Sequence, residues 1–222
     1  EAAPPKALFS LAKKLIEKEI VVTWWGNIRF EKTFTAEKCQ LLADSGCIAV
    51  SGGLEVASDR LLALMKKGVN VKQVANITKA FTQSGILVHA YLMYGFPSQT
   101  EQETVDALEY VRQLMQNGCI DSAYWHRFAA TIHSPVGLKP DEYGIKLIEN
   151  QQGGFAENDI EYIDSVQTNH DMLGKGLKKA LYNYMHHKGF EYPVSFWFDE
   201  PVRDTCITKH YISECLAGSP QH

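Results

Sequence analysis

The first 130 residues alternate between two hydrophobic patterns. Apolar residues three and four positions apart predict amphipathic helices, whereas short, continuous apolar runs predict strands buried on both faces. Such strands alternating with helices indicate a parallel sheet with helices on its outside. The runs predict strands over 20–25, 47–50, 86–94 and 120–128.

Polar cap residues mark where the intervening helices begin. Thr35 precedes a helix over 36–45, and Ser58 precedes one that ends at Gly68. Asn70 precedes a third helix, and Thr100 with Glu103 forms a capping box for a fourth. A further helix is predicted near the start, where Leu8, Leu11, Leu15 and Ile16 share one face.

The repeat of strand and helix is typical of (β/α) barrel units. Only four strands are predicted, so we expect an α/β fold with a partial, TIM-like barrel. A doubly wound sheet is the alternative, although no G-x-G-x-x-G motif follows a strand.

The pattern changes near Pro135, where Gly, Pro and Asn become frequent. A helix is predicted over 174–188, and 192–198 is either a strand or an extended packing arm. We therefore divide the chain into a partial barrel over 1–134 and a C-terminal extension over 135–222. The extension is expected to pack on the barrel or close its open edge, since a free edge promotes aggregation.

Composition narrows the class of protein. The net charge of −4 gives no reason to expect a nucleic-acid partner, and no apolar run approaches a membrane span. The five cysteines are odd in number and lack C-x-x-C spacing, which is typical of reduced thiols in a cytoplasmic protein. We interpret Cys39, Cys47 and Cys119 as small buried hydrophobes. Nothing near Cys206 or Cys215 completes a metal site, so none is predicted.

Candidate chemistry lies where the strands end, because sites of parallel α/β proteins form beyond the C-terminal ends of strands. The segments there are 26–29, 51–55, 95–100 and 124–127, which are rich in Gly and polar groups. This mixture matches a ligand with hydroxyls, a ring, an amine and a carboxylate. The Glu55 carboxylate is explained equally well without a ligand, as a negative charge that the dipole of the following helix stabilises at its N-terminus. Neither a catalytic dyad nor a phosphate loop is present, so catalytic residues stay unknown.

An ordered set of short motifs resembles a known family. It comprises Arg29, Ala-Asp-Ser-Gly-Cys at 43–47, Gly-Gly-Leu-Glu at 52–55, Leu-Met-Lys-Lys-Gly at 64–68, Ser-Gly-Ile at 84–86, and Tyr-Gly-Phe-Pro-Ser-Gln-Thr-Glu-Gln-Glu at 94–103. Together they resemble the core of radical S-adenosylmethionine (SAM) enzymes, especially the branch whose longer members carry a cobalamin-binding domain. The resemblance runs from about residue 8 to 135. It implies a (β/α)₆ partial barrel of which this chain supplies strands three to six.

The resemblance also implies which residues contact SAM. Glu55 is then near the ribose or methionine part, and Lys67, on the following helix, meets the methionine carboxylate. The turn 95–97 backs the adenine, the segment 126–128 contributes backbone contacts to it, and Tyr91 faces the same cavity. The implied cofactor-binding residues are Glu55, Lys67, Tyr91, Gly95, Phe96, Pro97, His126 and Phe128.

The chemistry implied by the resemblance is reductive cleavage of SAM at a [4Fe–4S] cluster. The resulting 5′-deoxyadenosyl radical serves hydrogen abstraction or radical methyl transfer on an unknown substrate. An electron donor such as flavodoxin or ferredoxin is implied, whereas use of cobalamin is left open.

The sequence differs from the family in lacking the cysteine motif that binds the [4Fe–4S] cluster. The motif C-x-x-x-C-x-x-C is absent, and Glu1 stands where a start Met is expected. We therefore expect a C-terminal part of such an enzyme, inactive alone. Two alternatives are open: a non-catalytic scaffold derived from the family, and another (β/α) enzyme using Glu55 or His126 in acid–base catalysis.

Overall fold

A four-stranded parallel sheet forms the centre of the molecule, as seen in the computed structural model, which describes residues 2–148 and 158–218. Each strand pairs with the next strand in sequence, giving the order β1-β2-β3-β4. This unidirectional order is that of a segment of a (β/α) barrel, and the doubly wound alternative, which reverses direction, is excluded. The strands are β1 (Trp24–Ile28), β2 (Cys47–Glu55), β3 (Leu87–Tyr94) and β4 (Ser122–Arg127).

The connecting helices begin where the sequence predicted. The side chains of Thr35, Ser58, Asn70 and Thr100 each accept a hydrogen bond from a backbone N–H in the first turn. The capping box between Thr100 and Glu103 is complete. These caps satisfy N–H groups that otherwise lack partners. The helices are α2 (Ala36–Asp44), α3 (Asp59–Leu64), α4 (Val71–Gln83) and α5 (Glu101–Gln116).

The sheet has one face buried by helices, which we call the outer face. Right-handed crossovers place consecutive connecting helices on the same side of such a sheet. The outer-face side chains Val50, Leu54, Val88, Leu92 and Trp125 are buried in one core with apolar residues of α4 and α5. The opposite face, which we call the inner face, carries the alternate residues of each strand.

Two predictions near the start were wrong, one of a strand's bounds and one of a helix's buried face. Strand β1 covers Trp24–Ile28 rather than 20–25, and Val21 is exposed. The neighbouring strand begins only at Cys47, opposite Trp24, so residues before Trp24 have no strand to pair with. In helix α1 (Pro5–Glu17), Leu8 is buried but Leu11 and Ile16 are exposed, because the helix lies at the edge beside β1 and α2.

Two predicted boundaries near β2 also differ. The strand continues through Glu55, so the residues 51–55 lie within it rather than in a loop. Helix α3 ends at Leu64, so Lys67 lies in the turn after the helix instead of on it. That turn ends at Gly68, whose φ of +71° is readily adopted only by glycine.

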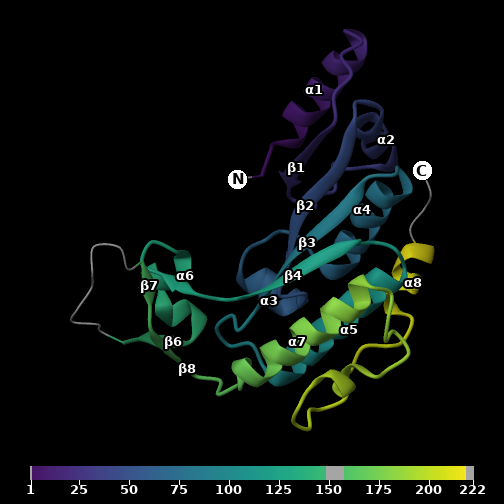
Figure 1. The fold of residues 1–222 in the computed structure, drawn as a ribbon. Helices are drawn as coiled ribbons and strands as arrows, with labels where there is room; N and C mark the ends of the chain where they lie inside the picture. The colour runs from purple at the N-terminus through teal and green to yellow at the C-terminus, as the bar shows by residue number, and fades with distance from the viewer. Residues whose placement is uncertain (1, 149–157, 219–222) are drawn as a thin grey trace.

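The C-terminal segment adds to the helical layer. Helix α7 begins at His170, four residues before the predicted start, since Asn169 caps it there. It contacts both α5 and β4, and runs along α5 in Figure 1. The segment 192–198, expected as a strand or an arm, contains a 3-10 helix instead. The elements are α7 (His170–Met185), η2 (Val194–Trp197) and α8 (Tyr211–Ala217).

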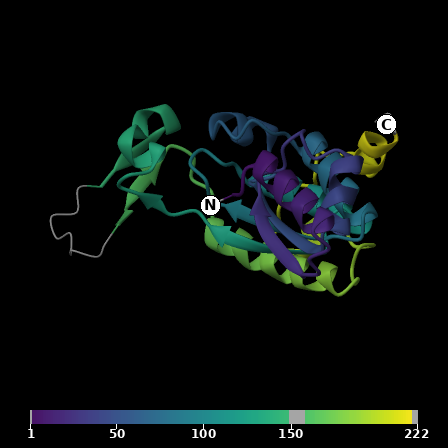
Figure 2. The ribbon, with the colours of Figure 1, turned by 90° about the horizontal axis from the view of Figure 1, so that it is seen from above.

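A small lobe projects from the C-terminal side of the sheet (Figures 1 and 2). A second apolar cluster joins it to the turn after β3, through Phe96, Tyr143, Val136 and Ile145. The lobe elements are β5 (Ala130–Thr131), α6 (Pro135–Leu138), η1 (Pro140–Tyr143), β6 (Ile145–Leu147), β7 (Asp159–Ile160) and β8 (Tyr162–Asp164).

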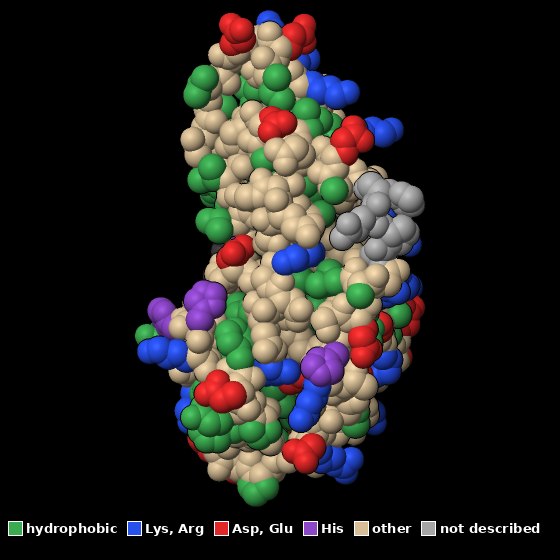
Figure 3. Space-filling view, turned by 90° about the vertical axis from the view of Figure 1, so that its right-hand side faces the viewer, with side chains coloured by type: hydrophobic (Ala, Val, Ile, Leu, Met, Phe, Trp, Pro, Cys, Tyr) green, Lys and Arg blue, Asp and Glu red, His purple; other side chains and the backbone are tan. Residues whose placement is uncertain are grey.

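The surface agrees with the small net charge. On the face shown in Figure 3, basic and acidic side chains are interspersed over the described residues. Among the described residues, no helix has the length and apolar character needed to cross a membrane.

Candidate functional site

A charged pair lies at the C-terminal end of β2. Lys67 Nζ is 2.9 Å from Glu55 Oε1, and both side chains are partly exposed. Arg29 Nη2 donates to the Lys67 carbonyl oxygen at 2.9 Å, which holds the turn carrying Lys67 against the end of β1. The sequence predicted both members of the pair, and the structure brings them together at the edge where sites of parallel sheets form.

The backbone of β2 directs Glu55 over the inner face. Glu55 has a φ of +58°, which is uncommon for a residue other than glycine. Its carboxylate folds back over Gly53, where an added Cβ would collide with it. Gly53 therefore leaves the space that the carboxylate occupies. Such a departure from ordinary backbone geometry is found often at ligand-binding positions.

Hydrogen bonds from within the protein fix the turn after β3. Gly95 has a φ of +77°, and its N–H donates to Oε1 of the buried Gln99 at 2.7 Å. The Gly95 carbonyl oxygen accepts from the Tyr162 hydroxyl at 3.3 Å. Phe96 and Pro97 are buried, and the Phe96 ring packs edge-on against Phe128 at 5.0 Å between centroids. The Phe96 and Phe128 side chains thus take part in the cluster that anchors the lobe.

Aromatic and imidazole rings lie together on the inner face. Tyr91 and His126, both predicted, have ring centroids 6.4 Å apart, and Tyr124 is 4.6 Å from His126. His89 is 5.2 Å from Tyr91 and shares a 2.8 Å hydrogen bond between Nδ1 and Ser122 Oγ. Burial and, secondarily, the nearby His126 lower the pKa of His89. His89 and Ser122 were not predicted from the sequence, although polar residues inside apolar strand runs were a usable signal.

An ion pair fixes the loop between β3 and α5. Arg60 donates from Nε and Nη2 to the two Glu103 carboxylate oxygens, each at 2.7 Å. Arg60 also donates to the Ser98 carbonyl oxygen at 2.8 Å. Burial of Glu103 favours its neutral form, but hydrogen bonds from Arg60 and the Thr100 backbone outweigh burial and lower the Glu103 pKa. This pair stabilises the loop beside the site. Both Glu103 carboxylate oxygens already accept hydrogen bonds from Arg60, so we assign the pair a structural role.

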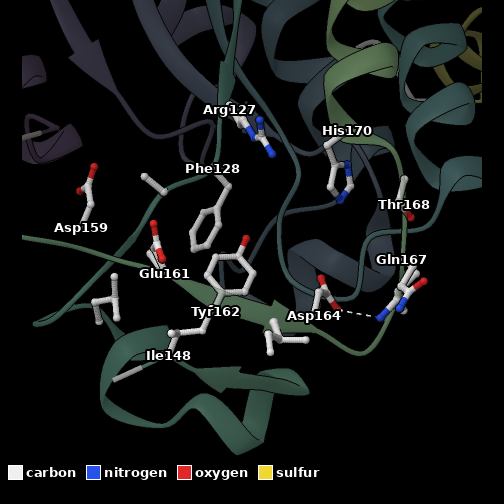
Figure 4. Close-up of a pocket in the computed structure, with 15 residues that line it drawn as sticks. Arg127, Phe128, Ile148, Asp159, Glu161, Tyr162, Asp164, Gln167, Thr168 and His170 are labelled. Atoms are coloured by element: carbon white, nitrogen blue, oxygen red, sulfur yellow. Dashed lines mark hydrogen bonds between the residues drawn. The ribbon is translucent and has the colours of Figure 1, made fainter. Parts of the chain in front are cut away.

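A cavity of about 580 Å³ lies between the end of β4 and the lobe (Figure 4). Arg127, Tyr162 and His170 contribute to its lining, and Arg127 pairs with Asp171 on α7. Both ring nitrogens of His170 are buried and lack a hydrogen-bond partner among the described residues. Burial first, and Arg127 second, lower the His170 pKa. No sequence motif marks this cavity, because its walls come mainly from the short strands β7 and β8 and the segment that leads into α7.

The cysteines do not fit an iron–sulfur cluster. None of the five forms a disulfide, and burial raises the pKa of Cys39 to about 12 and of Cys47 to about 11. A site-differentiated [4Fe–4S] cluster needs three convergent thiolates. The part of the chain that the structure describes contains no group of three His, Cys, Asp or Glu side chains able to hold a metal ion. These thiols therefore offer no site for such a cluster among the described residues.

Comparison with known proteins gives consistent matches. Residues 6–111 match the model of the radical SAM superfamily. Among curated proteins, an uncharacterized methyltransferase of Pyrococcus horikoshii is 23% identical over 109 residues, covering 49% of this chain and 24% of that protein. The anaerobic magnesium-protoporphyrin IX monomethyl ester cyclase of Rubrivivax gelatinosus is 26% identical over 121 residues, covering 54% and 21%. The matched part therefore spans less than a quarter of either relative.

Solved structures share the fold. The radical SAM methyltransferase TsrM from Kitasatospora setae, with cobalamin and a [4Fe–4S] cluster bound, superposes with a TM-score of 0.54 at 16% identity. The match covers 67% of this chain and 31% of TsrM. The cobalamin-dependent SAM radical enzyme OxsB, with aqua-cobalamin bound, gives 0.55 at 14% identity, covering 78% and 30%. At these identities the likeness establishes the partial-barrel fold.

Proposed function

We propose that this chain, which carries part of a radical SAM fold, supplies strands three to six of the barrel in an enzyme that reductively cleaves SAM. The observation that carries the proposal is the Glu55–Lys67 pair over Gly53 at the C-terminal end of β2. A carboxylate and an ammonium 2.9 Å apart offer acceptors for hydroxyls and a cation for a carboxylate.

Each member of the pair has a proposed role toward SAM. Glu55 accepts hydrogen bonds from the ribose hydroxyls or the methionine amine, and Lys67 pairs with the methionine carboxylate. Arg29 positions Lys67 through its backbone carbonyl. SAM, when bound and reduced, supplies the 5′-deoxyadenosyl radical, and these side chains orient it.

The adenine is proposed to lie against the inner face near Tyr91 and the backbone of 126–128. Tyr91 is 40% exposed there and can contact a ring directly. For the side chains of the remaining predicted residues we propose supporting roles. Phe96 and Phe128 pack with the lobe, and the Gly95 N–H is already bound to Gln99.

The proposed parent enzyme holds its cluster on thiolates other than these five, since the C-x-x-x-C-x-x-C motif is absent from this sequence. The radical then either abstracts a hydrogen atom from the unknown substrate or takes part in methyl transfer to it. A flavodoxin or ferredoxin delivers the electron in the cytoplasm, and cobalamin is a candidate second cofactor because the solved relatives bind it. Within this chain, 1–134 forms the barrel part and 135–222 the extension that packs on it.

Isothermal titration of the chain with SAM tests the role of Glu55. We expect Glu55→Gln to weaken SAM affinity about tenfold or more, because hydrogen bonds to a charged group contribute ~1.5–3 kcal/mol. Glu191→Gln, at an exposed glutamate that follows α7 and lies outside the cavity of Figure 4, is the matched control and should leave the affinity unchanged. Equal affinities for the two variants contradict the proposal.

A further inference from the structure

A row of polar residues crosses the inner face halfway along the sheet. Asn27 lies beside Ser51, Ser51 beside His89, and His89 beside Ser122, so that all four strands contribute. On the outer face at the same level, Val88 is fully buried under the helices. A face that packed against further protein would be apolar in the same way. This polar row is therefore suited to a ligand rather than to a protein core.

Four rings lie on and directly above this row, and we call them the ring platform. His89, Tyr91, His126 and Tyr124 form a continuous series with centroid separations of 5.2, 6.4 and 4.6 Å. Tyr124 is 52% exposed and Tyr91 40% exposed, so their rings are accessible to a ligand. Aromatic rings at such spacings favour contact with another flat ring through edge-to-face or offset stacking.

The residues of the polar row and the ring platform include no Lys, Arg, Asp or Glu. The charged pair Glu55 and Lys67 lies at the end of the strand, where the two opposite charges offset each other. Burial first, and the nearby His126 second, lower the pKa of His89 and so favour its neutral form. Asn27 Oδ1 is buried and accepts no hydrogen bond from the described residues. The surface thus offers ring contacts and hydrogen-bond acceptors, without an acidic side chain or a Lys or Arg for ion pairing.

We propose that the ring platform and the polar row bind the substrate of the enzyme, and that this substrate carries an uncharged planar aromatic or heteroaromatic ring with at least one N–H or O–H donor. The inference rests on the proposed function, in which SAM occupies the Glu55–Lys67 end of the strands. The pairs His89–Ser122 and Tyr91–Tyr124 lie before that end along the strands and belong to a second molecule. Tyr91 and His126, which also border the proposed adenine position, are walls that the two molecules share.

Indole, a flat uncharged ring with one N–H, is the probe for this site. It is titrated into the chain, and binding is followed by NMR through the ring-proton resonances of His89 and His126. We expect saturable shifts of both resonances. We expect affinity to fall at least about fivefold for 1-methylindole, which leaves acceptors unpaired, and further for cyclohexanol, which has a donor but no flat ring.

Two variants separate a specific site from a loose hydrophobic surface. Tyr124→Ala is expected to weaken indole binding roughly twofold to tenfold, the range for loss of one aromatic pair. Tyr182→Ala is the matched control, because Tyr182 is 62% exposed on α7, away from the sheet, and should have no effect.

Three outcomes overturn the inference: equal affinity for indole and cyclohexanol, equal effects of the two tyrosine variants, or complete displacement of indole by adenosine. The last would assign the ring platform to the nucleoside of SAM. Loss of SAM affinity in Glu55→Gln with unchanged indole binding supports both proposals. Unchanged SAM affinity in that variant refutes the proposed function alone.

Discussion

Successive side chains along each strand point alternately to the outer and the inner face of the sheet, yet the two faces carry different kinds of residue. Trp125 is buried on the outer face, whereas its neighbour Tyr124 is 52% exposed on the inner face. Gly52 lies against the Phe30 ring on the outer side, whereas Gly53 lies under the Glu55 carboxylate on the inner side. The outer face accounts for the stability of the fold, and the inner face keeps its polar and aromatic groups available. Substitution of adjacent residues can therefore separate folding from binding.

The largest effect is expected at Trp125. Replacing this buried side chain by Ala removes its core contacts and leaves a cavity, which costs ~3–5 kcal/mol of unfolding free energy. Tyr124→Ala, one residue away, should change the unfolding free energy by less than ~0.5 kcal/mol. Urea denaturation followed by circular dichroism measures both. Similar losses in the two variants would show that the inner face is also part of the core.

The two neighbouring glycines of β2 should separate stability from affinity. In Gly52→Ala the new Cβ would lie 2.6 Å from the Phe30 ring, so ~1–3 kcal/mol of stability is lost through overpacking. In Gly53→Ala the new Cβ meets the end of a flexible carboxylate, which can move away. We expect nearly full stability but weaker SAM binding, as Glu55 leaves Lys67. Thermal melts and SAM titrations of both variants test this, and weakened stability only in Gly53→Ala would contradict the assignment of faces.

A smaller, pH-dependent effect is expected at Glu103. Its lowered pKa means that its contribution to stability is complete above the pKa of a glutamate in the unfolded chain and is lost as the pH falls through the lower folded value. Glu103→Gln should therefore cost about 1 kcal/mol at pH 7, through the capping box and the partly exposed Arg60 pair. The difference from the original chain should shrink below about pH 4. A deficit that grows on acidification would contradict this account of the loop.

The sequence predicted most of the helices because their starts depend on local chemistry. Thr35, Ser58, Asn70 and Thr100 cap their helices through hydrogen bonds to residues three positions away. Strand limits were less predictable because they depend on a distant partner. Trp24 begins β1 only because Cys47 begins β2, and the Gly-Gly pair after Ser51 looked like a turn although both glycines lie within a paired strand.

The candidate site was only partly predictable. Glu55 is the last residue of β2 and Lys67 lies in the turn after the next helix, both within recognisable motifs, so their meeting at one edge could be expected. His89 and Ser122 interact through strand pairing, across 33 positions of sequence. The cavity around His170 depends on how the lobe folds back on β4, which no periodicity in the sequence encodes. Side chains brought together by packing thus escape motif analysis, whereas those at strand ends do not.

SAM binding at the inner face is tested most directly by mapping SAM on the chain by NMR, through backbone amide shifts during a titration. We predict shifts at Gly53, Glu55 and Lys67, at Tyr91, and along 126–128, and no separate group of shifts in the outer helices. Shifts clustered instead around the cavity lined by Tyr162 and His170, with the end of β2 unchanged, would show that the inner face is not the SAM-binding face.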